Sequence, residues 1–294
     1  MSYPFWERHF KITVAGNNEE ARSFGVDFDI SFEIVRTNGK EPNTAAVSIK
    51  GLNKASRGAF ETEYKRIWIE AGYVTRFANV FAGEIATAES KIASRETVTT
   101  ITAGDGDLAW VNGAMNETFA AGSKVSDVVR QLVQRGMPGV TVGSIIGLDD
   151  DITFVRPYVA NGATRDRLTE LARTYNAQWS IQNGEFEMIA RNRMGTQEAV
   201  VLTPDSGLIG SPAKTEKGIR AVCLLNGALK PNEPVIIESE TLSPNRGIYK
   251  IIAVKHSGST EGNNFFSEVE CISLAGQFVE VAPTADQAIA IAKT

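Results

Sequence analysis

The sequence has little of the chemistry that most enzymes use. Its 294 residues include two cysteines and two histidines. Cys223 and Cys271 are too few for a disulfide framework or a zinc site made from cysteine alone, and their apolar, strand-like surroundings predict buried thiols. His9 and His256 lie far apart in the sequence with no patterned ligand beside either, which argues against a histidine-based triad or metal centre. We expect His256 to lie at the exposed end of a strand.

Motifs for cofactors and nucleophiles are missing as well. No stretch matches the phosphate-binding loop GxxxxGK[ST] or the GxSxG elbow. Gly104-Asp105-Gly106-Asp107 lacks the spacing and closing glutamate of an EF-hand, so it predicts a tight turn after a strand. Asp149-Asp150-Asp151 predicts a solvated loop. Carboxylate pairs for glycoside hydrolysis have no fixed local spacing and carry little information. The sequence therefore predicts no catalytic, cofactor-binding or metal-binding residues and no enzyme.

Positive charge and long apolar runs are also scarce. The formal net charge is -5 at pH 7, and no third of the chain is basic, which disfavours nucleic-acid binding through phosphate neutralisation. No run approaches the roughly 18 apolar residues of a membrane span, so no membrane insertion is expected. The first ten residues lack the basic and apolar regions of a signal peptide. We expect the protein to fold in the cytoplasm of the cell that makes it.

What the chain has instead is alternation with a period of two. Between residues 24 and 34, apolar side chains alternate with glycine or polar ones; they are Phe24, Val26, Phe28, Ile30, Phe32 and Ile34. This pattern predicts a single half-buried strand that ends in a turn at Asn38-Gly39. Alternation continues around 47–49, 67–73, 80–86 and 97–103, with a short helix at 53–60. An antiparallel barrel or sandwich is expected.

Between residues 106 and 199 the period changes to that of helices. One apolar stripe, after Ser123 as the expected N-cap and before Gly136 and Pro138, comprises Val125, Val128, Val129, Leu132 and Val133. A second stripe comprises Leu168, Leu171, Ala172 and Tyr175. Asn183-Gly184 then favours a type I′ hairpin in which Ile181 faces Phe186 and Trp179 faces Met188. The pattern predicts a small α+β domain.

After residue 200 the period of two returns, and the chain resembles its own beginning. Three matched stretches keep their order: 46–49 with 221–224, 66–70 with 234–238, and 97–102 with 268–273. Their separation of about 170 residues indicates an internal duplication. We expect a first β-barrel (tube) domain at 1–105, the α+β domain at 106–199, a second β-barrel (tube) domain at 200–276 and a C-terminal tail at 277–294.

The tail has capping-box spacing at Thr284 and Gln287. A helix of about ten residues is marginal by itself, so we expect the tail to be mobile unless it docks on a partner.

The order of several short motifs resembles one known family. The motifs occupy residues 52–57, 81–85, 101–106, 207–212, 222–226 and 229–231. This layout is similar to the baseplate hub proteins of contractile-tailed phages and to the hub portion of type VI secretion spike proteins, over about residues 24–275. The resemblance implies a mainly β fold in which two similar tube-type β-barrels flank an α+β insert.

The resemblance also implies a function. It predicts a structural protein of the virion tail, assembled in the host bacterial cytoplasm as a homotrimer. As a symmetry adaptor it would join the hexameric tail tube protein to the trimeric central spike protein, contact other baseplate proteins and the tape measure protein, and line a channel through which DNA passes without specific binding. The apolar stretch 24–34 is expected near a seam between subunits.

Three other functions stay open. A receptor- or carbohydrate-binding module of the tail would also be β-rich and would expose aromatic platforms. Candidates are Trp6, Trp68 and Trp110, whereas Trp179 has a predicted partner across the hairpin and is expected in the core. A distal tail protein and a cell-wall hydrolase are the remaining alternatives.

Overall fold

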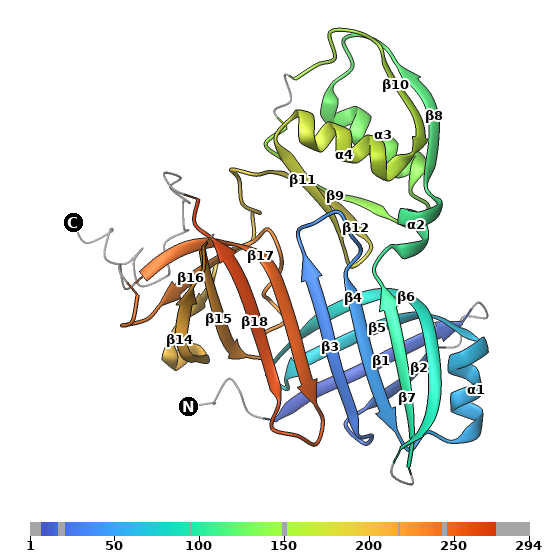
Figure 1. Cartoon of the computed structure of the whole chain (residues 1–294), viewed down its shortest axis with the longest axis vertical. Coiled ribbons are helices and arrows are strands. Elements are labelled where there is room, and N and C mark those ends of the chain that lie inside the picture. Colours follow the sequence, from blue (N-terminus) through green and yellow to red (C-terminus); the bar gives the residue numbers. More distant parts are fainter. Residues whose placement is uncertain are drawn as a thin grey trace.

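The computed structural model describes residues 7–16, 21–93, 96–148, 152–216, 218–242 and 246–274. The fold is mainly β with a small α-containing insert, as the sequence predicts. A large sheet holds strands from both ends of the chain, and the middle of the chain forms a separate lobe at one end of it (Figure 1). We call residues 8–104 the first repeat, 107–190 the middle segment and 200–272 the second repeat.

The first repeat is a curled antiparallel sheet with one short helix. Its elements are β1 (Arg8–Gly16), β2 (Ala21–Gly25), β3 (Ile30–Thr37), β4 (Thr44–Lys50), α1 (Lys54–Thr62), β5 (Tyr64–Tyr73), β6 (Arg76–Ala93) and β7 (Glu96–Gly104). The strands follow one another across the sheet in the order β3-β4-β7-β6-β5-β1-β2. The Asn53 side chain accepts a hydrogen bond from Ser56 N and so begins α1 at the predicted place.

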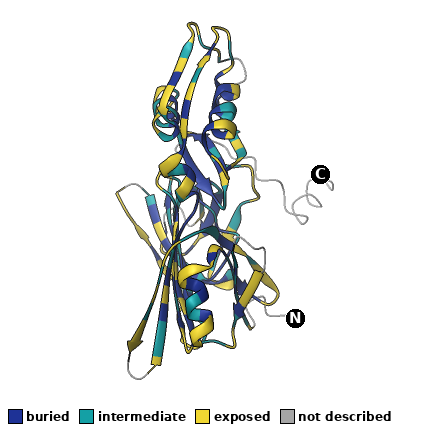
Figure 2. Cartoon of the chain, turned by 90° about the vertical axis from the view of Figure 1, so that its right-hand side faces the viewer, coloured by how far each residue is buried: buried dark blue, intermediate teal, exposed yellow. Residues whose placement is uncertain are grey.

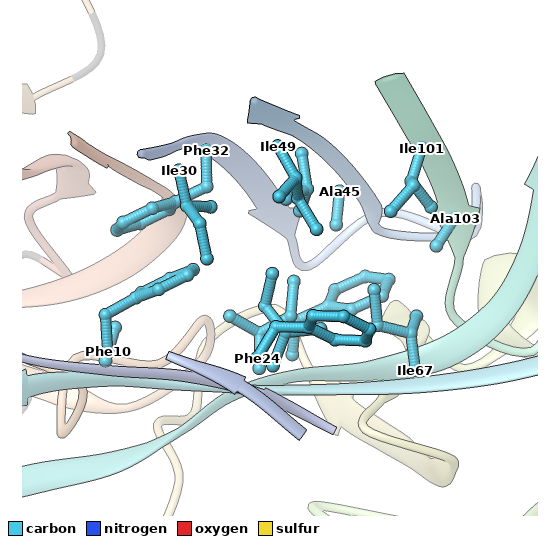
Figure 3. Packing of buried hydrophobic residues seen from close by; sticks show 14 of the residues in the cluster. Phe10, Phe24, Ile30, Phe32, Ala45, Ile49, Ile67, Ile101 and Ala103 are labelled. Carbon is cyan, nitrogen blue, oxygen red and sulfur yellow. The ribbon is translucent and has the colours of Figure 1, made fainter. Parts of the chain in front are cut away.

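The core of this repeat lies between two layers of the same sheet. Ile30, Phe32, Ile49 and Ile101 point inward from one layer, and Phe10, Phe24 and Ile67 meet them from the other (Figure 3). The rings of Phe10 and Phe32 stack with centroids 4.4 Å apart. Each large apolar side chain buried in this way contributes about 1.5–3 kcal/mol.

The predicted single strand over residues 24–34 is wrong. β2 ends at Gly25, a turn follows in which Phe28 N donates to Gly25 O at 3.1 Å, and β3 begins at Ile30. Val26 lies in that turn and is 58% exposed. Phe24 and Ile30 enter the same core from opposite layers, so the alternation of apolar residues continues across a reversal of the chain (Figure 3).

The middle segment packs helices against two small sheets. Its elements are α2 (Asp107–Asn112), β8 (Ala114–Phe119), α3 (Val125–Gly136), β9 (Thr141–Ile146), β10 (Tyr158–Ala163), α4 (Thr164–Thr174), β11 (Ala177–Gln182) and β12 (Glu185–Ala190). All five residues of the first predicted stripe are fully buried on α3. Leu168, Leu171 and Ala172 are buried on α4, and Tyr175 is its C-cap.

The predicted hairpin is confirmed, and one helix start is not. Ile181 pairs with Phe186 and Trp179 with Met188, around a turn in which Asn183 and Gly184 both have positive φ. The N-cap of α3 is Lys124 rather than Ser123. Ser123 belongs to a loop bridge instead, because its carbonyl accepts a hydrogen bond from Phe154 N.

The second repeat has the strand order of the first. Its elements are β13 (Val200–Leu202), the 3₁₀ turn η1 (Pro204–Ser206), β14 (Leu208–Lys214), β15 (Gly218–Leu224), β16 (Pro234–Glu238), β17 (Arg246–Ser259) and β18 (Phe265–Ile272). The order β14-β15-β18-β17-β16 corresponds to β3-β4-β7-β6-β5, and every pair in both series is antiparallel. This shared order supports the duplication.

A bulge at the same place in both repeats fixes their alignment. The register of β6 with β7 shifts between Ile85 and Thr87, and that of β17 with β18 shifts between Ile251 and Ala253. With these bulges superimposed, the match of 66–70 with 234–238 is in register. The other two sequence matches are slipped by an odd number of residues, because Ala46 corresponds to Arg220 and Thr102 to Glu270. An odd slip exchanges the two faces of a strand.

Burial follows this architecture. In the view of Figure 2, buried residues line the interior of the strands, while α1 presents exposed residues on its outer side. Three buried apolar clusters centre on the first repeat, the middle segment and the second repeat. The expected division into four domains stays a prediction. Among the described residues, no helix has the length and apolar character that a membrane span requires.

Candidate assembly interface

The two repeats are joined by a continuous strand pairing, which we call the seam. Residues 253–259 of β17 pair antiparallel with residues 31–37 of β3. Hydrogen bonds extend the pairing at both ends, from Asn38 N to Ile252 O at 3.0 Å and from Thr260 N to Ile30 O at 2.9 Å. β3, which holds part of the apolar stretch 24–34, is therefore placed at a seam between two repeats of one chain.

Side chains cross the seam as well as backbone bonds. The Phe265 ring at the start of β18 packs edge-on against Phe32 and against Tyr73, with centroids 5.9 and 5.7 Å apart. Phe265 and Leu225 belong to the buried cluster of the first repeat. The two repeats thus share a core as well as a sheet. At the seam, one repeat extends the sheet of the other.

His256 lies within the seam, opposite Ile34, and is fully buried. The expected exposed position at a strand end is therefore wrong. β17 continues to Ser259, beyond the apolar run visible in the sequence, and β3 covers its edge. The Nδ1 atom lies 2.8 Å from the Ser267 hydroxyl. Burial, and then the charge of Arg36, lower the pKa of His256 to about 3.

A first polar joint attaches the middle segment to the first repeat. Arg36, almost fully buried on β3, donates from Nε and Nη2 to Gln182 Oε1 at 3.2 and 3.0 Å. Asn43 Nδ2 donates to Ile181 O at 2.8 Å. Both partners lie at the end of β11, so the tip of the β11–β12 hairpin rests on the ends of β3 and β4 (Figure 1).

Asp105 holds the hairpin turn itself. Its carboxylate accepts hydrogen bonds from Asn183 N and from Gly184 N, the latter at 2.7 Å. Burial raises the pKa of Asp105, and the two backbone N–H groups counteract that rise. The predicted tight turn at 104–107 is present, since the chain bends at 105 and 106 before α2. Its role as a clamp for a turn distant in the sequence was missed, because no local pattern marks such a partner.

A second polar joint attaches the middle segment to the second repeat. Gln178 Nε2 donates to Asn232 Oδ1 at 2.9 Å, and Asn232 Nδ2 donates to Glu187 Oε2 at 3.4 Å. Lys250 is fully buried beside this group, and burial, together with the charge of Arg191, lowers its pKa to about 8. Burial also raises the pKa values of Glu187 and Glu233. Hydrogen bonds to Arg36 of the first repeat and to Asn232 of the second repeat thus hold the middle segment against both repeats.

Two of the four tryptophans, Trp110 and Trp179, are hydrogen-bonded within the fold. Trp179 is 2% exposed and donates from Nε1 to Thr169 Oγ1, so its predicted place in the core is confirmed. Trp110 donates to Lys40 O at 2.9 Å and lies 4.3 Å beneath the Arg165 guanidinium. Trp68 lines an open groove of about 240 Å³ between β5–β6 and the tip of the β11–β12 hairpin. Trp6 lies outside the described residues.

The remaining residues singled out in the sequence are the two cysteines, His9 and the acidic run. Cys223 and Cys271 are buried free thiols, as predicted, and burial raises the pKa of each to about 12. His9 is paired with Glu70 at 3.4 Å and stacked on Phe77. In the part of the chain that the structure describes, no cluster of His, Cys, Asp and Glu is suited to a metal ion. Asp149-Asp150-Asp151 and the tail at 277–294 fall outside that part.

Two of the open strand edges in the large sheet correspond to the two sides of the seam. Among the described residues, β14 pairs only with β15, and residues 87–93 of β6 pair only with β7. Each edge carries an exposed isoleucine: Ile209 is 40% exposed and Ile92 is 82% exposed. Exposed edges of this kind are ready to pair with another chain. The edges lie at opposite sides of the molecule (Figure 1).

Known proteins resemble this chain in sequence pattern and in fold. The family model described as Baseplate hub gp41 matches residues 31–271. No curated protein matches the sequence. The 43 kDa tail protein of prophage MuSo2 from Shewanella oneidensis has a TM-score of 0.62 at 6% identity, covering 90% of this chain and 97% of its own.

Two further solved structures share the fold. The tail protein from Neisseria meningitidis MC58 has a TM-score of 0.61 at 9% identity, over 90% of this chain and 96% of its own. The E. coli c3393 protein is a type VI secretion component described as similar to the T4 tail proteins gp27 and gp5. It has a TM-score of 0.58 at 11% identity, over 87% of this chain and 77% of its own.

Proposed function

Because the chain belongs to the baseplate hub gp41 family, we propose that it forms the trimeric hub that joins the hexameric tail tube to the trimeric central spike. Membership of the family makes it a structural component of a phage tail baseplate and places it in the virion tail. The trimer, the tube and the spike are our proposal, and the internal duplication is the observation that carries it.

The symmetry of a ring built from such chains supports this proposal. Each chain contains two repeats with the same strand order and the same bulge. Three chains in a ring therefore present six similar tube-type barrels to a sixfold partner, while the ring as a whole keeps threefold symmetry. A closed ring also removes open strand edges, which are an aggregation hazard in a free subunit. The middle segment occurs once per chain, so three copies of it can meet a threefold partner.

The partners follow from this position. On the sixfold side we propose the tail tube protein, with the tape measure protein in its lumen. On the threefold side we propose the spike protein, and other baseplate proteins surround the ring. DNA passes through the channel without specific binding, which suits a chain whose net charge is -5. Among the solved structures of similar fold are chains of Francisella PdpA-VgrG complexes.

We assign the chain no catalytic role. The carboxylates of buried Asp105 and of partly buried Glu187 and Glu233 accept hydrogen bonds from backbone or side-chain donors. A carbohydrate-binding role would need free aromatic platforms; Trp110 and Trp179 are both hydrogen-bonded within the fold, and Trp68 lines an open groove. The structural role accounts for these residues directly.

Cryo-electron microscopy of intact tails tests the proposal. The expected result is one ring of three copies per particle, in contact with the tube on one face and the spike on the other. Six copies in a single ring would instead make the chain a tube-like or distal tail protein and would refute the adaptor mechanism.

A further inference from the structure

We propose that β6 of one copy pairs with β14 of the next, residues 88–93 against the outer edge of 211–216, as an intermolecular counterpart of the seam. This inference rests on the proposed ring and specifies the contact that closes it. The partner is a second copy of this chain, because the template for the pairing is the contact between the two repeats of one copy.

The bulges give the correspondence between residues. Just after its bulge, each repeat has a row of paired residues across the sheet. In the first repeat the row is Glu33, Ala46, Thr102 and Thr87. In the second repeat it is Ala213, Arg220, Glu270 and Ala253. β14 therefore stands where β3 stands, and residues 87–93 of β6 stand where residues 253–259 of β17 stand.

This correspondence predicts a register. In the seam, Ser257 of β17 faces Glu33 of β3. Lys91 lies four residues after Thr87, as Ser257 lies four after Ala253, so Lys91 of one copy faces Ala213 of the next. The same register places Ser90 opposite Lys214 and Glu89 opposite Thr215. No like charges face each other, which would destabilise a directly opposed pair.

The backbone groups needed for pairing point outward on both edges. Gly51 N donates to Thr97 O, so the backbone N–H and C=O groups of odd-numbered β7 residues point toward β4. Those of even-numbered β7 residues therefore point toward β6, where they pair with odd-numbered residues. The N–H and C=O groups of Ala88, Ser90 and Ile92 are therefore left on the free edge. On β14, Thr215 N bonds Gly218 O, which leaves the backbone groups of Lys214 outward.

In this register Pro212 faces Ile92 and leaves the Ile92 carbonyl without a donor, so the pairing has one hydrogen bond fewer than the seam. Pro212 lacks an N–H, and proline in a strand is confined to edges and bulges. It lies between Ile209 and Ala213, where the register of β14 with β15 is already shifted. The stretch from residue 213 onward has no proline and carries the predicted contacts.

Disulfide trapping between chains tests the register. Lys91 and Ala213 form a pair without direct hydrogen bonds, for which Cα atoms are about 4.5 Å apart and a disulfide can close. Lys91→Cys protein is mixed with Ala213→Cys protein under mild oxidation, and a non-reducing gel is read. The native cysteines are buried and do not compete. The expected product is a dimer that contains one chain of each kind. The matched control mixes Lys91→Cys with Ser23→Cys, which lies on the exposed edge strand β2, and should give no such dimer.

A second pair of variants tests the edge without a disulfide. Ser90→Pro removes an outward N–H and leaves the bonds from β6 to β7 in place, so the copies should no longer associate. Ser90→Thr keeps the N–H and should associate like the wild type, and circular dichroism confirms that both variants fold.

The outcomes separate this inference from the proposed function. A three-copy ring that forms without the Lys91–Ala213 disulfide overturns the pairing and leaves the hub standing. The disulfide in a ring of another size supports the pairing and refutes the trimer. Absence of the mixed dimer at every protein concentration up to the solubility limit overturns the inference, as does an equal yield with Ser23→Cys.

Discussion

Acid should weaken the seam through His256. This side chain is fully buried opposite Ile34, and its Nδ1 lies beside the Ser267 hydroxyl. Its pKa is lowered from 6.5 to about 3 in the folded protein. Below about pH 6.5, His256 is therefore protonated in the unfolded chain and stays neutral in the folded chain. A histidine with a lowered folded pKa contributes stability that is present above the unfolded pKa and is lost as the pH falls toward the folded one.

The size of the effect follows from the two pKa values. Each pH unit between 6.5 and about 3 removes about 1.4 kcal/mol from the free energy of unfolding. At about pH 5 the loss from this one group is therefore about 2 kcal/mol relative to about pH 8. Other acidic groups also titrate in this range, so the wild type alone does not isolate the histidine.

The comparison with His256→Gln does isolate it. Glutamine keeps a hydrogen-bonding group near Ser267 and does not titrate. Urea unfolding, followed by circular dichroism at about pH 8 and about pH 5, should show the wild type losing about 2 kcal/mol more than the variant across this interval. An equal loss in both proteins refutes the reasoning, because His256 would then not be held neutral by the seam.

Two further predictions concern the polar joints. Asp105→Ala leaves the part-buried N–H groups of Asn183 and Gly184 without their acceptor and should lower the free energy of unfolding by about 2 kcal/mol, while Asp105→Asn should lose roughly half of that. Hydrogen exchange should accelerate at residues 183 and 184 in the alanine variant, and unchanged exchange there would contradict the clamp. The pKa of Lys250 is lowered from 10.5 to about 8, so the unfolded state binds more protons in that interval and the wild type should become more stable as the pH rises through it. Lys250→Met should lack this rise and exposed Lys255→Met should keep it; the same rise in both variants would argue against a buried, titrating Lys250.

The sequence predicts those features that depend on neighbouring residues. The α3 stripe, the helix that begins after Asn53 and the Asn183-Gly184 hairpin are all local, and the structure confirms them. Features that depend on distant partners were missed. The reversal between β2 and β3 is hidden because both strands point apolar side chains into one core. The burial of His256 depends on β3, more than two hundred positions away in the sequence.

For the duplication, the sequence predicts the order of the strands but not the register between them. Strand order could be inferred from three weak matches, since each pair of segments corresponds to equivalent strands. Register could not, because alternating strands match one another almost as well after a slip of one or three residues. Only the bulges near Ala86 and Ile252 fix it. A bulge is a backbone feature without a reliable sequence signature, so no inspection of residue types would have located it.

The position of the bulges also explains why the chain has one internal seam and, among its open edges, one pair that corresponds to the two sides of that seam. β5 pairs with β6 only up to Glu84, and β16 pairs with β17 only up to Lys250, so in each repeat the neighbouring strand stops just before the bulge. The rest of the long strand is then free on that side. In the second repeat β3 of the first repeat occupies it, whereas no described strand occupies the matching stretch of the first repeat, residues 87–93. Each repeat thus has one free stretch (87–93 of β6 or 253–259 of β17) and one edge strand (β3 or β14). The seam joins the free stretch of β17 to the edge strand β3. The remaining stretch, residues 87–93, and the remaining edge, that of β14, correspond to the two sides of the seam, and on this correspondence we propose a further copy of the chain as their partner.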